Sequence, residues 1–140
     1  MPIKVPTGLP ALQAVIDEGC EIEVLTTTTE KTLKIVLLNL MPMKETTEAD
    51  FIRVLSTSKE EVELVLMKLD THTPKHATPE HMQRFYKGFS ELRGSKFDGL
   101  IITGAPIEKI AFEEVTYWPE LCEIFEWAKS VEFVNDGYNV

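Results

Sequence analysis

Two short segments of the chain combine small or polar residues with a place where a strand is expected to end. In Thr103–Pro106 (TGAP), small residues after an apolar run can let backbone N–H groups approach an oxyanion or a carbonyl. Asn39–Pro42 (NLMP) follows another apolar run, and the cation Lys44 comes just after it. Because ligand sites in open α/β sheets gather at the carboxyl ends of the strands, both segments and Lys44 are expected to face one crevice.

Each of these features also has a simpler interpretation. Most turns of this composition only reverse the chain, and on composition alone a lysine such as Lys44 is more often an ordinary surface residue. Glu108, which follows the second segment, projects either into the same crevice or into solvent, and spacing does not decide between them. The residue types therefore define a candidate site but not its chemistry.

The histidines do not have the spacing of a metal site. Pro74 lies between His72 and His76 and opposes a helix that would present both on one face, and no acidic or thiol ligand completes the set. We interpret His72, His76 and His81 as residues of a solvated loop, and we predict no metal site.

The two cysteines, Cys20 and Cys122, lie far apart in the sequence without a CxxC motif, so neither a disulfide nor a structural zinc is indicated. Carboxylates next to Cys122 oppose the thiolate that a nucleophile needs. Both cysteines are expected to be reduced, inert thiols.

Composition excludes several functional classes. The 140 residues suit one domain with its own core, and 44% of them are hydrophobic, as in a folded protein. With 14 Lys and Arg against 23 Asp and Glu, the formal charge is −9, which disfavours nucleic-acid binding. The sequence contains neither an apolar run long enough to cross a membrane nor a secretory signal, so we expect a cytoplasmic protein.

Apolar runs alternate with amphipathic stretches from Thr32 onward, which indicates βα units and a parallel sheet. The expected strands are Leu33–Leu40, Val62–Leu69 and Phe97–Gly104, and Glu63 and Lys68 suggest that the second of these lies nearer the sheet edge. The expected helices begin at Thr46–Glu48 and at Thr78, the latter with Met82, Phe85, Tyr86 and Phe89 on one face, and a last helix covers Tyr117–Lys129.

We divide the chain into an N-terminal arm (1–31), half of an α/β domain (32–130) and a divergent tail (131–140). In the arm we expect a short helix over Leu9–Glu18 and an extended edge piece over Glu21–Thr29. The alternation of strands and helices stops within the tail.

Several ordered motifs resemble those of the homoserine O-acyltransferase (homoserine O-succinyltransferase) family of methionine biosynthesis. The motifs are Met1–Pro6 with Leu9-Pro10, Leu37–Pro42 with Lys44 and Thr47-Glu48, Phe97–Pro106, and Tyr117–Pro119 with Glu126-Trp127. The resemblance implies a flavodoxin-like α/β fold, as in class I glutamine amidotransferases, with helices on both faces of a parallel sheet that is incomplete on its C-terminal side. It also implies acyl transfer from acyl-CoA to L-homoserine through an acyl-cysteine, with acyl-CoA as co-substrate and no further cofactor.

The resemblance assigns roles to individual positions. It places Gly104 and Ala105 in a turn that contributes a backbone donor to an oxyanion hole, and it places Lys44 near the acyl-CoA or substrate end of the crevice. Glu108 occupies the position that selects the acyl donor, where glutamate accompanies acetyl-CoA and glycine succinyl-CoA. A carboxylate there repels the free carboxylate of a succinyl group, so the expected donor is acetyl-CoA.

The sequence departs from the family at the nucleophile. Members carry a cysteine elbow after the helix that contains Glu126-Trp127, whereas Val131–Val140 does not match it and Asn139 stands about where the cysteine would fall. The activating histidine and glutamate that come later in the family are also missing from the sequence. We therefore expect a truncated homoserine O-acetyltransferase that is catalytically incomplete alone.

The alternative is a non-catalytic acyl-CoA-binding or self-associating module. On either interpretation the sheet should have an unpaired edge, so we expect self-association, for example as a homodimer.

Overall fold

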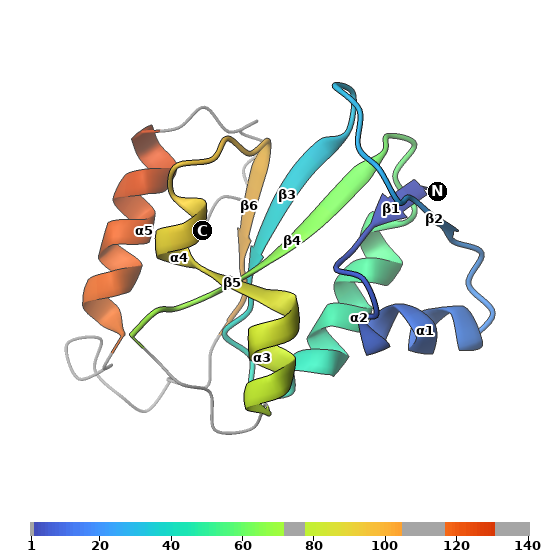
Figure 1. The fold of residues 1–140 in the computed structure, drawn as a ribbon, viewed down its shortest axis with the longest axis horizontal. Coiled ribbons are helices and arrows are strands. Elements are labelled where there is room, and N and C mark those ends of the chain that lie inside the picture. Colours follow the sequence, from blue (N-terminus) through green and yellow to red (C-terminus); the bar gives the residue numbers. More distant parts are fainter. Residues whose placement is uncertain (1, 72–77, 105–116, 131–140) are drawn as a thin grey trace.

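The computed structural model describes residues 2–71, 78–104 and 117–130. Together they form a parallel sheet with helices packed against it (Figure 1). The strands are β1 (Pro2–Lys4), β2 (Glu23–Val24), β3 (Leu33–Leu38), β4 (Val62–Lys68), β5 (Tyr86–Gly88) and β6 (Gly99–Ile102). The helices are α1 (Pro10–Asp17), α2 (Lys44–Leu55), α3 (Pro79–Phe85), α4 (Phe89–Leu92) and α5 (Trp118–Ser130).

The sheet has the order β2-β1-β4-β3-β6, and β5 pairs with β4 off this path. Every pairing is parallel, and β3 aligns with both neighbours in one register, Leu38 lying opposite Met67 of β4 and Ile102 of β6. This register brings the carboxyl ends of β3 and β6 together. The predicted α/β class with a parallel, flavodoxin-like sheet is confirmed.

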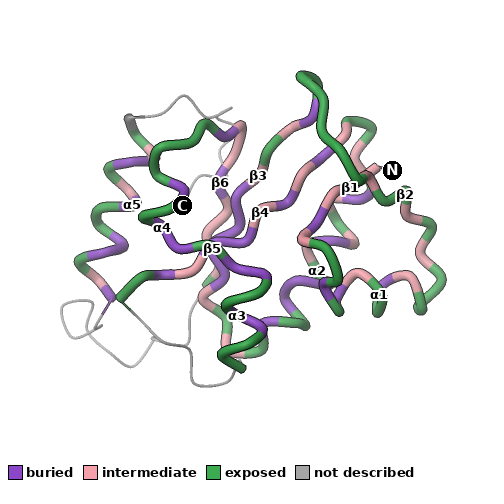
Figure 2. Tube along the Cα trace, in the orientation of Figure 1, coloured by how far each residue is buried: buried purple, intermediate pink, exposed green. Residues whose placement is uncertain are grey.

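Alternate residues of the central strands point to opposite faces of the sheet, as the pleat requires. On one face Leu37, Leu64 and Leu66 pack against α1, α2 and α3. On the other, Val36, Leu38 and Met67 pack against α4 and α5. Figure 1 shows α1 and α2 on one side of the sheet and α4 and α5 on the other, and Figure 2 shows buried positions along β3 and β4. Helices therefore cover both faces, as predicted.

The prediction that Val62–Leu69 lies nearer the sheet edge is wrong. This strand, β4, lies in the middle of the order and pairs with β1, β3 and β5. Its charged residues lie near its two ends, where they can stay partly exposed. Glu63 forms an ion pair with Lys4 at 3.0 Å, and Lys68 is the last residue of the strand. Charge near the ends of a strand thus does not mark an edge position.

The N-terminal region contributes more to the sheet than was predicted. Helix α1 matches the expected helix, and β2 matches the expected edge piece. The sequence predicts no strand before Leu9, yet Pro2–Lys4 forms β1, which lies between β2 and β4. Ile3 of β1 is completely buried in the core. The tail, 131–140, lies outside the described residues.

The helix predicted from Thr78 begins as expected but ends early. The Thr78 hydroxyl accepts a hydrogen bond from the backbone N–H of His81, and Pro79 occupies the first turn. The helix stops at Phe85, because Tyr86–Gly88 pairs with β4 as a short strand. The predicted single apolar face is therefore divided, with Tyr86 packed on one side of the sheet and Phe89 on the other.

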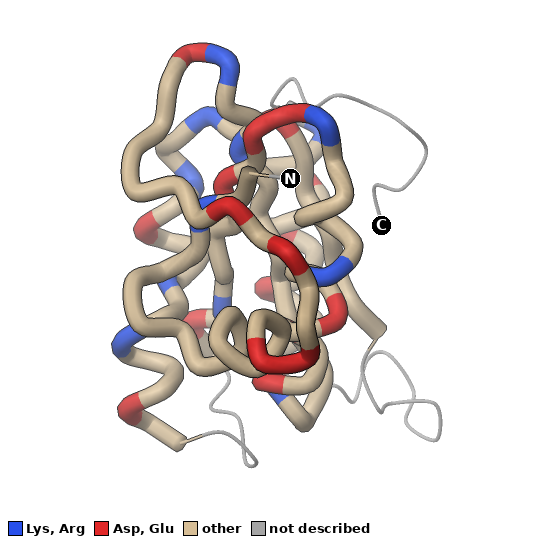
Figure 3. Tube along the Cα trace, turned by 90° about the vertical axis from the view of Figure 1, so that its right-hand side faces the viewer, with Lys and Arg blue, Asp and Glu red and all other residues tan. Residues whose placement is uncertain are grey.

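Charged residues of both signs lie near one another on one side of the molecule. Figure 3 shows acidic and basic positions interspersed on the side that carries α1 and α2. One ion-pair group joins these helices: Arg53 of α2 donates to Glu18 at 2.8 Å through Nε, and to Asp50 at 2.7 Å. Among the described residues, no helix has the length and apolar character needed to span a membrane.

Candidate functional site

The candidate site lies where β3 ends and α2 begins. Helix α2 starts at Lys44 rather than at the predicted Thr46–Glu48, so Glu48 falls inside the helix instead of at its cap. The Lys44 side chain is only 7% exposed, and its Nζ donates a hydrogen bond of 2.6 Å to the backbone oxygen of Asn39. The interpretation of Lys44 as an ordinary surface lysine is therefore wrong.

The ends of β3 and β6 are joined directly, as the sequence predicts for two parallel strands. The Thr103 hydroxyl accepts a hydrogen bond of 2.7 Å from the Leu40 N–H, and the Thr103 N–H donates to the Leu38 carbonyl at 3.1 Å. Gly104 follows as an exposed residue, and in the part of the chain that the structure describes no heavy atom lies within 4 Å of the place a Cβ would take. The described residues thus give no close backbone approach at Gly104.

Two of the predicted site residues, Ala105 and Glu108, lie outside the described residues. Their assigned roles, like those of Gly104 and Lys44, remain predictions. What the structure adds is the surroundings of Lys44, which can be built up from the residues that contact it.

A small cavity of about 30 Å³ lies beside Lys44, with Asn39, Lys68, Met82 and Tyr117 among its lining residues. This volume is sufficient for one or two water molecules. The cavity brings the ends of β3 and β4, the start of α2, helix α3 and the segment before α5 to one place. It is lined by two lysine side chains, of which Lys44 is the more buried.

One helical turn after Lys44, α2 carries a second buried ionisable group, the carboxyl group of Glu48. Glu48 is completely buried. Its Oε2 accepts a short hydrogen bond from the Tyr86 hydroxyl and lies 2.9 Å from His81 Nε2, whereas its Oε1 has no hydrogen-bond partner among the described residues. The Asn39 amide nitrogen donates to the Tyr86 oxygen at 3.0 Å, which connects the carboxyl group to the end of β3.

Burial dominates the electrostatics of these groups. It raises the pKa of Glu48, and the hydrogen bonds from Tyr86 and His81 oppose that rise. Burial, followed by the charge of Glu48, raises the pKa of Tyr86, so the phenol stays a hydrogen-bond donor at neutral pH. Burial lowers the pKa of Lys44 to about 8, while the charge of Glu48 acts in the opposite direction. Ionisable groups shifted by desolvation and by named neighbours are typical of functional sites.

The interpretation of the histidines as a solvated loop is wrong for His81. This side chain is 9% exposed and lies on α3, with Glu48 on one side and the exposed Glu45 at 3.7 Å from Nδ1 on the other. His72 and His76 lie outside the described residues. Among the residues that are described, no three His, Cys, Asp or Glu side chains form a group that could hold a metal ion.

Sequence reasoning missed Glu48 and Tyr86. A signal for Glu48 existed, since it lies four residues after Lys44 and four before the buried Ile52, on one stripe of the helix. No comparable signal marked Tyr86, because its position depends on the break between α3 and α4.

The cysteines are free, as predicted, and neither lines the cavity beside Lys44. Cys122 is exposed on α5, and Cys20 is half-buried after α1. Neither thiol is therefore placed to act with Lys44.

A larger cavity of about 410 Å³ lies over β4, between β1 and α3. Two of its charged lining residues, Lys4 and Glu63, already form an ion pair with each other. It does not include the ends of β3 or β6, so we place the candidate site at Lys44, where buried ionisable groups converge.

Comparison with known proteins agrees with this arrangement of motifs. The family model described as homoserine O-succinyltransferase matches residues 2–133, which is almost the whole chain. The chain belongs to this family. It is a family of homoserine acyltransferases of methionine biosynthesis, so the resemblance predicted from the motifs is confirmed.

Curated relatives within this family carry the name homoserine O-acetyltransferase. The chain is 47% identical to the protein of that name from Bacteroides thetaiotaomicron, over 93% of this chain and 44% of the relative. It is 48% identical to the one from Clostridium beijerinckii, over 95% of this chain and 45% of the relative. The protein from Ruegeria sp. is 46% identical over 93% of this chain and 43% of its own length. The chain thus spans less than half the length of these relatives.

Proposed function

We propose that this chain forms the N-terminal part of a homoserine O-acetyltransferase. The observation that carries the proposal is the match of residues 2–133 to the family, together with 47% and 48% identity to proteins named homoserine O-acetyltransferase. The reaction would transfer the acetyl group of acetyl-CoA to the hydroxyl of L-homoserine. No cofactor beyond this co-substrate is needed for acyl transfer.

Within that reaction, the residues at the ends of β3 and β6 would bind and polarise the acyl donor. Lys44 offers a cation at the edge of the sheet, and its pKa of about 8 keeps most of it protonated at neutral pH. Backbone donors at Gly104 and Ala105 would stabilise an oxyanion once a bound acyl donor excludes water from the exposed Gly104, because preorganised N–H groups act strongly without competing water. These assignments are supported by the family motifs and by the burial of Lys44.

The acetyl preference rests on Glu108. A carboxylate in the acyl pocket repels the carboxylate of a succinyl group and fills the space that it needs. Calorimetry with acetyl-CoA and succinyl-CoA on the chain and on Glu108→Gly tests this. We expect the variant to lose discrimination against succinyl-CoA, and unchanged discrimination would contradict the assignment.

We further propose that this chain alone does not catalyse acyl transfer. The mechanism of the family needs a nucleophilic cysteine, and neither Cys20 nor Cys122 lines the cavity beside Lys44. The test is chromatographic detection of CoA after incubation of the purified chain with acetyl-CoA and L-homoserine. We expect no CoA above the protein-free control, whereas release that Lys44→Met abolishes would refute the proposal of inactivity.

The same preparation tests the alternative, a non-catalytic acyl-CoA-binding module. The observation that favours it is the position of two lysine side chains, Lys44 at the start of α2 and Lys68 at the end of β4, which lie beside one another and could contact an anionic ligand. Saturable binding of acetyl-CoA at micromolar concentration, without turnover, would support this module.

Self-association is a separate proposal. Among the described residues, β6 pairs only with β3, so its other side can accept a strand from a second copy. Sedimentation equilibrium over a range of concentrations tests it, and a monomer at high concentration would refute it.

A further inference from the structure

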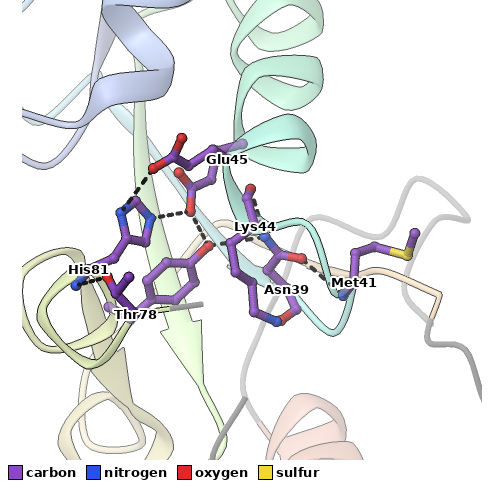
Figure 4. A network of polar contacts seen from close by, with 8 residues as sticks. Asn39, Met41, Lys44, Glu45, Thr78 and His81 are labelled. Carbon is purple, nitrogen blue, oxygen red and sulfur yellow. Dashed lines mark hydrogen bonds and ion pairs between the residues drawn. The ribbon is translucent and has the colours of Figure 1, made fainter. Parts of the chain in front are cut away.

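The groups around Lys44 form one connected network of hydrogen bonds that joins α2, α3, β5 and the loop after β3 (Figure 4). It begins at His81 on α3, passes through the Glu48 carboxyl on α2 and continues to the Tyr86 hydroxyl on β5. From Tyr86 it reaches the Asn39 side chain, which follows β3, and the backbone oxygen of Asn39 accepts from Lys44 Nζ at 2.6 Å. The position of the lysine is thus connected, bond by bond, to a carboxyl group inside the protein.

Burying the Glu48 carboxyl group at this position opposes folding. It is completely buried, and one of its carboxyl oxygens has no partner in the part of the chain that the structure describes. Desolvating a carboxyl group opposes folding unless its oxygens are satisfied, and an apolar residue of similar volume would avoid that penalty. The buried face of α2 carries Lys44 and Thr47 as well as the apolar Ala49 and Ile52, so Glu48 lies among other polar groups and its carboxyl group has a role besides packing.

The Asn39 side chain shows what it contributes. Its amide nitrogen donates to Tyr86 at 3.0 Å and to the backbone oxygen of Lys44 at 3.4 Å, and its amide oxygen accepts from the Met41 N–H at 3.1 Å. It therefore holds both ends of the loop between β3 and α2. Tyr86 fixes this amide, and Glu48 in turn fixes the hydrogen of the Tyr86 hydroxyl.

We propose that Glu48 is a positioning residue for Lys44, holding its ammonium group against the end of β3 through Tyr86 and Asn39. The proposal rests on the function proposed above for Lys44 and adds to it the residue that determines the geometry and charge of that lysine. Glu48 does not need to touch a substrate for this role.

Electrostatics supports the same connection. Burial lowers the pKa of Lys44 to about 8, and the negative charge of Glu48 limits that decrease. The other charged or titratable groups around the pair are Tyr86, His81 and the exposed Glu45, with Lys68 and Tyr117 across the cavity. Of these groups, Glu48 is the one whose charge acts on Lys44 from inside the protein.

The test is an NMR titration of the Lys44 side-chain nitrogen in the 140-residue chain, with the signal assigned by its loss in Lys44→Arg. In Glu48→Gln, which preserves size and removes the charge, we expect the pKa of Lys44 to fall below the value in the unsubstituted chain. In Tyr86→Phe we expect a fall as well, because Glu48 loses the donor that stabilises its ionised form. The matched control is Glu45→Gln, the same change on the same helix at an exposed side chain, where we expect no shift.

Each other outcome would overturn the proposal. An unchanged pKa of Lys44 in Glu48→Gln means that the acid does not act on the lysine. Equal shifts in Glu48→Gln and Glu45→Gln mean that the pKa responds to any nearby negative charge through solvent, and not to the buried network. A rise toward 10.5 means that the site has opened and that Glu48 only packs, because exposure removes the desolvation that depresses the pKa. An unchanged pKa in Tyr86→Phe refutes the connection through the phenol.

The titration needs no acyl transfer, so it remains informative if the proposed function fails. If CoA binding and the acetyl preference are refuted while Glu48→Gln still lowers the pKa of Lys44, the positioning role stands without the acyltransferase assignment. If the titration fails and the binding tests succeed, only the positioning role is lost.

Discussion

Glu120 attaches α5 to the end of β4, and its removal should cost a large part of the stability of the fold. Its side chain is 6% exposed and accepts three hydrogen bonds, from the Asp70 N–H at 2.7 Å, the Thr71 N–H at 2.8 Å and the Thr71 hydroxyl at 2.7 Å. In Glu120→Ala all three donors lose their acceptor. A donor left without its partner costs about 1 to 3 kcal/mol, and water can replace the partner of the exposed Thr71 hydroxyl. Asp70 and Thr71 are exposed residues, so water also replaces part of what their backbone N–H groups lose, and we expect a loss of about 2 to 3 kcal/mol.

Urea unfolding followed by circular dichroism measures this loss. With an m-value of about 2 kcal/mol/M, the midpoint should fall by about 1 to 1.5 M. The control is Glu123→Ala on the same helix, where the side chain is exposed and the change should stay within about 0.5 kcal/mol. Glu120→Gln, which keeps one acceptor oxygen, should fall between the two. If Glu120→Ala and Glu123→Ala unfold at the same midpoint, the reasoning that these bonds hold α5 in place is refuted.

Two further predictions concern the backbone and the pH dependence of stability. Gly8 has φ +82°, and a Cβ there would lie 2.9 Å from the Arg84 guanidinium, so Gly8→Ala should lower the unfolding free energy by about 1 to 2 kcal/mol. In Gly94→Ala, no described atom outside the adjacent residues lies within 4 Å of the added Cβ, so the unfolding free energy should hardly change. Equal losses in Gly8→Ala and Gly94→Ala, measured by urea unfolding, would contradict this account. Burial lowers the pKa of Lys44 from 10.5 to about 8, so the unfolded chain binds the extra proton between these values and stability should rise with pH there. Relative to Lys44→Met, the gain should approach about 3 kcal/mol between pH 8 and 10.5, and a difference that stays flat with pH would refute it.

The parallel sheet could be predicted because each strand and helix is marked by a pattern within its own short segment of sequence. Leu33–Leu38 is a continuous apolar run, which indicates a strand covered on both faces, and the segments on either side of it have helical periodicity. The motif at Asn39 and Lys44 placed the candidate site at the correct edge of the sheet, since the ends of parallel strands meet by geometry alone.

The errors arose where distant segments decide the structure. The break at Tyr86 is determined by pairing with β4 and by the carboxyl group of Glu48, neither of which the local pattern of α3 contains. In the same way, Glu48 resembles an acidic residue of a first helical turn, because the sequence does not show that α2 begins at Lys44. The burial of His81 and its contact with Glu48 depend on the packing of α3 against α2, which the sequence around His81 does not show.

The place of β1 in the sheet constrains how the chain can fold. Its neighbour β4 lies about sixty residues further along, with 59 positions separating the paired Lys4 and Glu63. During synthesis at about 5 to 20 residues per second, β2 follows early, but the first strand waits roughly 3 to 12 s before β4, which joins it to the rest of the sheet, exists. Until then Ile3 and its neighbours have no core to join. The first strand to be made thus joins the centre of the sheet only after β3 and β4 have been synthesised, and folding of the sheet cannot proceed simply from the N-terminus onward.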